Sequence, residues 1–363
     1  MPYMKKLLSL PSLLLFVTLL SGLFSSAPVH ALLVQGLYEQ EIAVQDQGDA
    51  ERIRAYREGL TAVILKITGV ERHLGNAAVQ RAVRDAQSYV QEVSYRSDST
   101  GPEPRTLISV SFDSALVNQM LMSSGVPVWD RDRPAVLLWL SVQNATGQRE
   151  LLSADSEHPM LEIVREFSRV RGLPVLIPVM DLEDRRNLPA DVAWSLDEAA
   201  IRNASARYGA DAILSGRLLE SPNGDLVGLW QFLFRGSAET FDAFERDLSV
   251  YTLGTLNQVT AQLASHFAFN SLEAPANSRV TVRVEGMDSA TDYVNLMAYM
   301  DNLAVVDTVA AALLDGSGIE LDVWLSSSAF LFTEFISLGR DLQPLEVPGQ
   351  STEQSVLHFR WVR

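Results

Sequence analysis

The acidic segment at residues 180–187 is the part of the sequence whose residue types and spacing point most directly to chemistry. It contains Asp181, Glu183 and Asp184, and it follows the apolar stretch 174–179, which has the composition of a buried strand. Ligand sites in α/β sheets tend to lie beyond the carboxyl ends of such strands. Carboxylates at this place can act as acid and base in glycan hydrolysis, and their oxygens can bind a hard cation.

A structural interpretation of the same segment is simpler. The acids would then lie in a solvated loop and pair with Arg185 and Arg186. Alternating charges of this kind are common at protein surfaces and contribute little to stability. We favour this interpretation because no second carboxylate cluster of obvious partnership occurs elsewhere in the sequence.

Two nearby positions pose the same choice between structure and binding. Arg217 lies in the apolar stretch 212–219, where a half-buried guanidinium needs a carboxylate, and the acids at 181–184 are its expected partners. The pair Arg207 and Tyr208 is weighed in the same way. Structural locking is favoured over ligand binding.

Other catalytic and metal-binding patterns are missing from the sequence. Beyond the first 31 residues the histidines are far apart and lack paired metal-ligand spacing, and there is no phosphate-loop, calcium-loop, His-Glu-x-x-His or Gly-x-Ser-x-Gly motif. The chain has no cysteine, which excludes disulfides, thiol nucleophiles and cysteine-bound metals. We therefore predict no catalytic residue, no metal site and no cofactor.

The first 31 residues have the pattern of a secretory signal peptide. Lys5 and Lys6 precede the apolar run 7–24, and a polar stretch ends with small residues suited to cleavage after Ala31. The alternative is a retained membrane anchor, but proline, glycine and hydroxyl residues interrupt the run. No later stretch approaches the ~20 apolar residues that a spanning helix needs. We expect an exported, soluble periplasmic protein without an integral membrane span.

Composition narrows the classes of partner. The chain has 363 residues, of which 47% are apolar, and a net charge of −16, which becomes −18 when Lys5 and Lys6 are removed. An acidic surface repels nucleic acid and anionic lipid headgroups, so neither is expected as a partner. The length remaining after Ala31 suits two or three domains.

Hydrophobic periodicity divides the chain into an N-terminal α+β domain at 32–125, a middle α/β domain at 134–270 and a C-terminal ferredoxin-like domain at 278–363. In the N-terminal domain we expect strands at 38–45 and 108–112, a helix capped by Asp49, a second helix at 76–90 and a third at 115–122. In the middle domain we expect strands at 135–142 and 174–179, a hairpin of 212–220 with 226–234, and a further strand before the closing helix. Helices are expected at 161–172, from a Ser195/Glu198 capping box to Gly209, and at 256–267. In the last domain we expect strands at 280–284, 305–314, 319–325, 342–345 and 356–362, a helix opened by Ser289 and Asp292, and a helix at 330–338.

A family resemblance rests on the stretch 175–218. Its Asp181, Asp184, Trp194, Arg207-Tyr208 and Gly216-Arg217 resemble the signature of an exported proteobacterial family, the domain of unknown function 2066 family. Further matching residues lie outside that stretch, at Lys66-Ile67-Thr68-Gly69, Phe112-Asp113, Trp129, Arg133-Pro134 and Trp139. The resemblance covers nearly all of the chain after Ala31 and implies a shared fold, but it implies no activity.

The middle domain also resembles domains of cell-envelope assembly proteins. The residues 208–216 are similar to a segment in the curli-secretion lipoprotein, in the amino-terminal domain of the Tol-system propeller protein and in the flagellar T-ring protein. The chain departs from the curli protein because it lacks a cysteine for lipidation.

These observations predict a non-enzymatic periplasmic protein that binds another cell-envelope protein as an adaptor or assembly factor. The alternative is a periplasmic glycan-binding protein or glycan hydrolase that uses the acidic segment 181–184 together with Asp191. Candidate binding residues are Asp181, Asp184, Asp191, Trp194, Arg207, Tyr208 and Arg217. The sequence does not indicate an oligomeric state.

Overall fold

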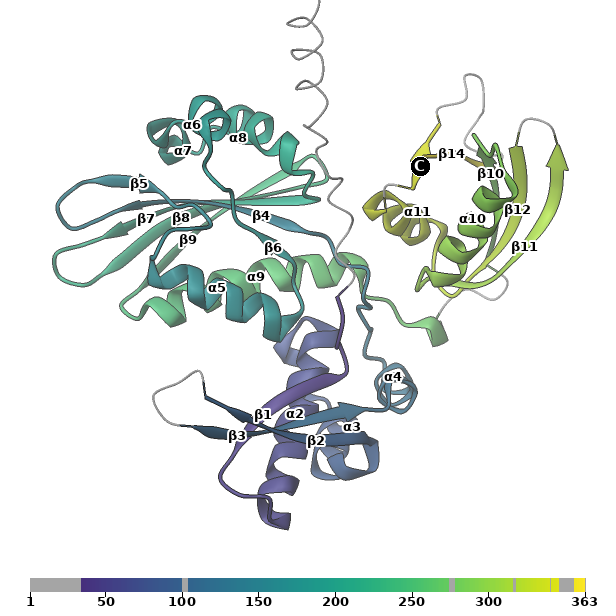
Figure 1. The fold of residues 1–363 in the computed structure, drawn as a ribbon, viewed down its shortest axis with the longest axis horizontal. Helices are drawn as coiled ribbons and strands as arrows, with labels where there is room; N and C mark the ends of the chain where they lie inside the picture. The colour runs from purple at the N-terminus through teal and green to yellow at the C-terminus, as the bar shows by residue number, and fades with distance from the viewer. Residues whose placement is uncertain are drawn as a thin grey trace, which may run out of the picture. The chain divides into compact units, whose positions relative to one another are not determined.

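The computed structural model describes residues 34–99, 104–273, 278–315, 318–339, 341–345 and 356–362. These residues form three separate β-sheets in chain order, each with its own helices (Figure 1). The prediction of mixed α+β and α/β modules in series is confirmed. The predicted signal segment, including Ala31, lies outside the described residues.

The first sheet has three antiparallel strands in the order β1-β3-β2 and packs against α2. Helix α2 buries Leu60, Val63, Ile64 and Ile67 against the sheet, where Ile108 and its neighbours complete the core. The elements are β1 (Glu39–Val44), α2 (Asp49–Thr68), α3 (Ala77–Arg84), β2 (Val90–Asp98), β3 (Arg105–Phe112) and α4 (Ser114–Ser123), with short 3-10 turns at Glu71–Gly75 and Ala86–Tyr89.

Two predictions in this region are wrong in detail. The helix expected at 76–90 ends at Arg84, and Val90 begins strand β2, which periodicity did not reveal because most of its side chains are polar and exposed. Its pairing with β3 makes it a strand. Asp49 lies in the first turn of α2, and Gly48 occupies the cap position.

The second sheet has the order β5-β4-β7-β8-β9, and β6 also pairs with β4. Figure 1 shows α5 and α9 on one face of the sheet and α6, α7 and α8 on the other. Strand β4 serves both faces, because Leu138 and Leu140 join one core while Leu137 and Trp139 join the other. The elements are β4 (Val136–Gln143), β5 (Arg149–Leu151), α5 (Pro159–Arg171), β6 (Val175–Leu176), α6 (Leu182–Asn187), α7 (Ala190–Ser195), α8 (Glu198–Ser205), β7 (Ala212–Glu220), β8 (Leu226–Phe234), β9 (Ser237–Glu245) and α9 (Leu248–Phe267).

The structure corrects three predictions in this sheet and its helices. The strand expected at 174–179 shrinks to the two residues of β6, because the chain then leaves the sheet toward α6. Helix α8 is capped by Asp197, whose side chain accepts from the backbone of Ala200, whereas Ser195 ends α7. Helix α9 begins at Leu248 instead of near 256. The hairpin of β7 and β8 and the further strand β9 are confirmed.

The third sheet has the order β11-β12-β10-β14-β13. Strands β10, β11 and β12 with α10 form the split β-α-β arrangement of a ferredoxin-like fold, and the Ser289/Asp292 capping box that opens α10 is confirmed. The end of the chain differs from a plain ferredoxin-like sandwich, because β14 pairs with β10 in parallel. The elements are β10 (Arg279–Glu285), α10 (Ala290–Asn302), β11 (Val306–Asp315), β12 (Gly318–Leu325), α11 (Ala329–Leu338), β13 (Leu342–Pro344) and β14 (Val356–Trp361).

A fully buried arginine joins the ends of two helices. Arg133 donates from Nη2 to the carbonyl of Lys66 at 2.8 Å and from Nη1 to the carbonyl of Arg171 at 2.9 Å. Its remaining bonds go to the carbonyls of Trp129, Asp130 and Gly172. The last carbonyls of a helix lack partners within the helix and carry partial negative charge, so a guanidinium fits there.

Close packing at the end of α2 leaves no room for a side chain at position 69. Gly69 has φ +70°, and a Cβ built there would lie 2.4 Å from the Cβ of Ala264 in α9. Lys66, one turn earlier, is buried and donates to the carbonyls of Gly36 and Glu39 at 3.1 and 2.9 Å. Burial lowers the pKa of this lysine to about 8.

Polar and aromatic contacts connect α11 to the middle sheet. Glu334 of α11 accepts from Arg235 at 3.0 Å and lies 2.7 Å from Nε2 of His266. The ring of Phe335 packs against that of Phe267 at 5.6 Å. The buried core of the middle module therefore continues into the C-terminal module.

Replacing Arg133 tests whether its bonds stabilise the fold. Arg133→Met should lower the free energy of unfolding by about 3–5 kcal/mol, because buried carbonyls lose their donors. Arg133→Lys should have a free energy of unfolding between those of the wild type and Arg133→Met, because an ammonium has three donors where the guanidinium has five. Urea denaturation measures these values. The control is Arg169→Met on α5, whose side chain is 58% exposed, and a loss for Arg133→Met no larger than for this control would contradict the expectation.

Asp132 should make stability depend on pH in the acidic range. Burial, reinforced by Asp130, raises the pKa of Asp132 to about 6. The folded state then holds more protons than the unfolded state between about pH 4 and 6, so stability falls as the pH rises through this window. Asp132→Asn should remove that fall and gain about 3 kcal/mol at pH 7. Urea titrations at pH 4.5, 6 and 7 measure it, and parallel curves for the two proteins would contradict it.

Candidate functional site

The acidic segment begins a helix instead of a loop. The side chain of Asp181 accepts from the backbone N–H groups of Glu183 and Asp184, both at 3.0 Å, and so caps α6. Asx side chains are favoured at this position because the first backbone N–H groups of a helix lack partners. One of the predicted site residues therefore has a local structural task.

Arg207 is the cation that pairs with these acids. It lies in the 3-10 turn Ala206–Tyr208, and its two terminal nitrogens bond the two carboxylate oxygens of Asp181 at 2.7 and 2.8 Å. The same Nη1 reaches Asp184 at 3.1 Å. The expected partners Arg185 and Arg186 do not do this, and Arg185 donates to the carbonyl of Met180. The hydrogen bond from Arg207 holds the pKa of Asp181 well below its usual range.

Tyr208 connects this acid–arginine group to the core. Its hydroxyl donates to Asp184 at 2.5 Å and accepts from the backbone N–H of Val179 at 3.2 Å. The Asp184 side chain is 0% exposed. The tyrosine ring meets the buried Trp139 edge-on at 5.9 Å, and burial raises the pKa of Tyr208. Asp181, Asp184, Arg207 and Tyr208, which we call the lock, connect α6 to the turn after α8.

The remaining predicted residues form a second group. Asp191 pairs with Arg149 at 3.3 Å, and the Arg149 guanidinium lies 4.5 Å from the centre of the Trp194 ring. Arg217 donates to the carbonyl of Trp194 at 3.3 Å and lies 5.9 Å from its ring. The expectation that Arg217 pairs with the acids at 181–184 is therefore wrong, because Arg207 occupies them.

This geometry does not resemble a hydrolase centre. A general acid needs a raised pKa, whereas that of Asp181 is lowered, and Asp184 is buried under Tyr208. Across the described ranges, no group of three His, Asp or Glu side chains could hold a metal ion. The lock holds α6 and the turn after α8 in place, which is a structural role.

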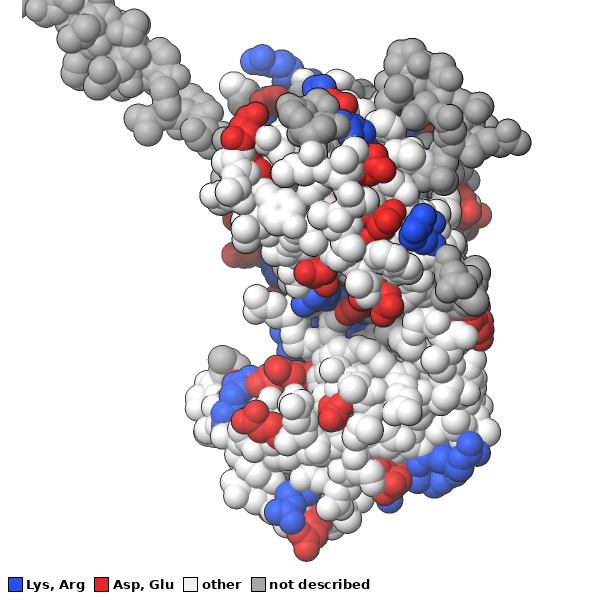
Figure 2. Space-filling view, turned by 90° about the vertical axis from the view of Figure 1, so that its right-hand side faces the viewer, with Lys and Arg blue, Asp and Glu red and all other residues white. Residues whose placement is uncertain are grey.

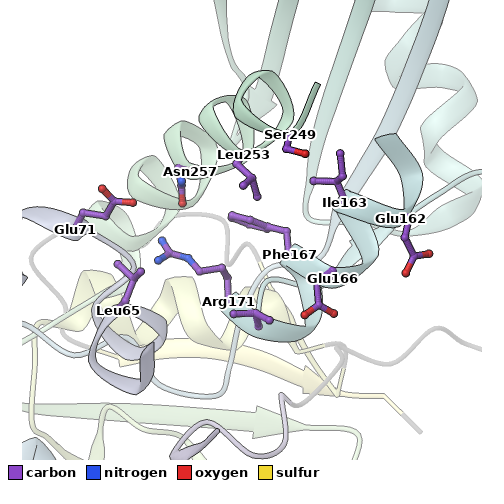
Figure 3. Close-up of a pocket in the computed structure, with 11 residues that line it drawn as sticks. Leu65, Glu71, Glu162, Ile163, Glu166, Phe167, Arg171, Ser249, Leu253 and Asn257 are labelled. Carbon is purple, nitrogen blue, oxygen red and sulfur yellow. The ribbon is translucent and has the colours of Figure 1, made fainter. Parts of the chain in front are cut away.

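A different site lies between α5 and α9. Both helices present a stripe of residues four apart, Ile163, Phe167 and Arg171 on one and Ser249, Leu253 and Asn257 on the other, and these positions share a helix face. Figure 3 shows the stripes side by side, with Arg171 and Asn257 at the end near Leu65 and Glu71. The space they enclose is about 510 Å³ and mostly apolar. Its lining residues are Leu65, Glu71, Glu162, Ile163, Glu166, Phe167, Val170, Arg171, Ser249, Leu253 and Asn257.

Unpartnered polar atoms mark the Arg171 end of this groove. Arg171 is only 6% exposed, and its Nη2 donates to the carbonyl of Gly69 at 3.1 Å. Its Nε and Nη1, and Oδ1 of Asn257, are buried and find no hydrogen-bond partner among the described residues. Burial lowers the pKa of Arg171 to about 10, against the opposing charge of Glu71, so the side chain stays charged at neutral pH. Buried donors of this kind are rare in native proteins and call for an explanation.

The groove was not predicted from the sequence. The stripes on α5 and α9 have the ordinary spacing of core-facing residues, and Leu65 and Glu71 come from a different module. Arg171 bonds a carbonyl 102 positions away in the chain. The only local signal was an arginine at a helix end, where basic residues are common.

Charged side chains of both signs lie on the surface. On the face shown in Figure 2, acidic side chains are scattered between uncharged areas, and basic side chains lie beside several of them. Within the described ranges, no helix is both long enough and apolar enough to span a bilayer.

The fold and these sites define a mixed α/β protein with a ligand-sized groove between two helices. Residues 31–130 match a protein family described as "Domain of unknown function (DUF8605)". This match supports an uncharacterised domain family for the N-terminal module. It does not confirm the resemblance to the domain of unknown function 2066 family.

Other comparisons add no function. No curated protein matches the chain. A solved structure titled "Crystal structure of uncharacterized protein" is similar at 13% identity, covering 37% of this chain and 95% of that one with a TM-score of 0.14. We draw no argument from so low a score.

The lock makes a prediction about stability and activity. Asp184→Ala should lower the free energy of unfolding by about 2–3 kcal/mol, because it removes the buried acceptor of Tyr208 and Arg207. A double-mutant cycle of Asp184→Asn with Tyr208→Phe should give a coupling of about 1 kcal/mol. Urea denaturation measures both.

The matched control is Glu183→Ala, an adjacent acid that is 61% exposed and 3.7 Å from Arg207. It should change stability by less than about 0.5 kcal/mol. An Asp184→Ala protein as stable as this control, but lacking a glycan hydrolysis that the wild type shows, would restore the catalytic interpretation.

Proposed function

We propose that the chain is a non-enzymatic exported protein of the periplasm that binds another cell-envelope component as an adaptor or assembly factor. The observation that carries the proposal is the apolar groove that ends in a buried, partly unpartnered Arg171. Leaving such donors without a partner costs free energy, and a bound partner that supplies acceptors recovers it. A groove of this size is within the range of ligand sites.

Features of the sequence support export. The segment 1–31 has the order of a signal peptide, and the chain lacks cysteine and is acidic. The likeness of residues 208–216 to envelope assembly proteins points to the same compartment, although a shared fold does not by itself transfer function. We also propose that the chain is a member of the domain of unknown function 2066 family, because of the resemblance over residues 175–218.

The glycan alternative has less support. Its acids Asp181 and Asp184 are taken up by Arg207 and Tyr208, and Asp191 pairs with Arg149. A hydrolase needs a carboxylate pair free to meet substrate. We therefore retain binding as the proposed activity.

Site-specific cross-linking in cells that export the protein tests the proposal. A photoreactive residue at Leu253, which lines the groove and is 38% exposed, should capture one discrete envelope component. The matched position is Val250 on the same helix, which is 53% exposed and is not among the groove residues. A component captured equally at both positions, or at neither, would contradict the proposal.

Export has its own measurement. The protein recovered from the periplasmic fraction should begin at Leu32, as shown by mass spectrometry of its N-terminal peptide. Recovery in the cytosol with residues 1–31 intact would overturn the proposed location.

A further inference from the structure

We infer that the groove between α5 and α9 binds the C-terminal end of a peptide whose last residue is apolar. This inference rests on the proposed function and names the chemistry of the partner. It follows from three features of the groove, which are a buried cation, a buried acceptor beside it and an apolar wall.

The cation asks for an anionic acceptor. Nε and Nη1 of Arg171 are buried without hydrogen-bond partners among the described residues, and Nη2 is used by Gly69. Glu71 lies on the same wall, but it forms neither a hydrogen bond nor an ion pair with this guanidinium. A carboxylate supplies both the oxygens and the negative charge, and charge-assisted hydrogen bonds are stronger than neutral ones.

The acceptor asks for a donor next to that carboxylate. Asn257 stands at the same end of the groove as Arg171, and its Oδ1 is buried and without a partner in the described part of the chain. The last residue of a peptide carries a backbone N–H beside its terminal carboxylate. A fatty acid carries a carboxylate without that N–H, so the pair Arg171 and Asn257 favours the peptide.

The apolar wall asks for apolar side chains. Leu65, Phe167, Val170 and Leu253 are among the apolar residues that line the groove, with Leu65 near its Arg171 end (Figure 3). From Ile163 to Arg171 the wall of α5 is about 12 Å long, since each helical residue adds about 1.5 Å. An extended peptide advances about 3.3 Å per residue, so three or four residues fit.

The acids at the open side carry their own partners. Glu166 bonds Arg169 at 2.6 Å, and Glu162 lies 3.8 Å from Arg165. They therefore weaken the attraction of Arg171 for a carboxylate less than unpaired acids would. Glu71 also lines the groove without an ion-pair partner among the described residues, and its charge offsets part of that of Arg171, whose buried Nε and Nη1 remain the donors without a hydrogen-bond partner.

Binding is measured by fluorescence anisotropy with the protein from residue 32 to 363 and labelled hexapeptides that share a Gly/Ser/Ala body. The last residue is Leu, Phe, Val, Lys or Asp, each with a free carboxylate or a C-terminal amide. The free-acid forms ending in Leu, Phe or Val should bind at least tenfold more tightly than their amides and than the peptides ending in Lys or Asp. Decanoate is the competitor that separates a fatty acid from a peptide.

Three variants and one control variant test the assignment. Arg171→Gln should weaken the best peptide at least tenfold and remove the difference between acid and amide, and Asn257→Leu should weaken it about threefold or more. Leu253→Asp should weaken binding while Val250→Asp, a matched change outside the groove, should not. Circular dichroism and thermal melting show which variants are folded, and the Leu253/Val250 pair decides the result if Arg171→Gln does not fold.

The inference fails if no peptide binds below 1 mM, if amides bind as well as acids, or if decanoate competes as strongly as the best peptide. Such a failure is separable from failure of the proposed function. A partner cross-linked at Leu253 but not at Val250, and still captured after its own C-terminal residues are deleted, would keep the adaptor proposal and overturn the terminal-carboxylate inference.

Discussion

The buried Arg133 is the contact on which the arrangement of the first two modules depends. It bonds five backbone carbonyls, including those of Lys66 near the end of α2 and of Arg171 at the end of α5. It also stacks over the ring of Trp129 at 4.3 Å. Burial lowers the pKa of Arg133 to about 9, and the carbonyl dipoles that surround it stabilise the charged form.

The groove is a consequence of this junction. The carboxyl ends of α2 and α5 converge on one guanidinium. Leu65 and Glu71 therefore line the same groove as Phe167 and Arg171, and its volume is about 510 Å³. Ala264 of α9 packs closely against Gly69, so that α9 lies beside the ends of α2 and α5 and forms another wall of the groove. The junction and the proposed binding groove thus share one set of contacts, in which Arg133 uses all five of its donors and Arg171 uses only part of its own.

Local signals allowed much of the fold to be predicted, and non-local ones did not. The Ser289/Asp292 box and the hairpin at Gly224 are written in a few adjacent residues, so both were predictable. Strand β2 was missed because its polar side chains carry no periodic signal and its partner β3 defines it. Competing caps a residue or two apart misplaced the start of α8.

The candidate site followed the same rule. The sequence predicted that the acids at 181–184 pair with arginines, namely Arg185, Arg186 and Arg217, where the fold supplies Arg207. A single guanidinium can satisfy these acids, and which one does so depends on the turn after α8. The groove needed residues from two modules, and neither half is distinctive alone.

The burial of Lys66 has a practical consequence for covalent labelling. It is the only lysine after Lys6, and its amine is enclosed and bonded to the carbonyls of Gly36 and Glu39. An acylating reagent therefore meets no other side-chain amine in residues 32–363, and it meets this one only when the first module opens. The rate at which this single amine is modified therefore reports the rate of local unfolding beside the groove.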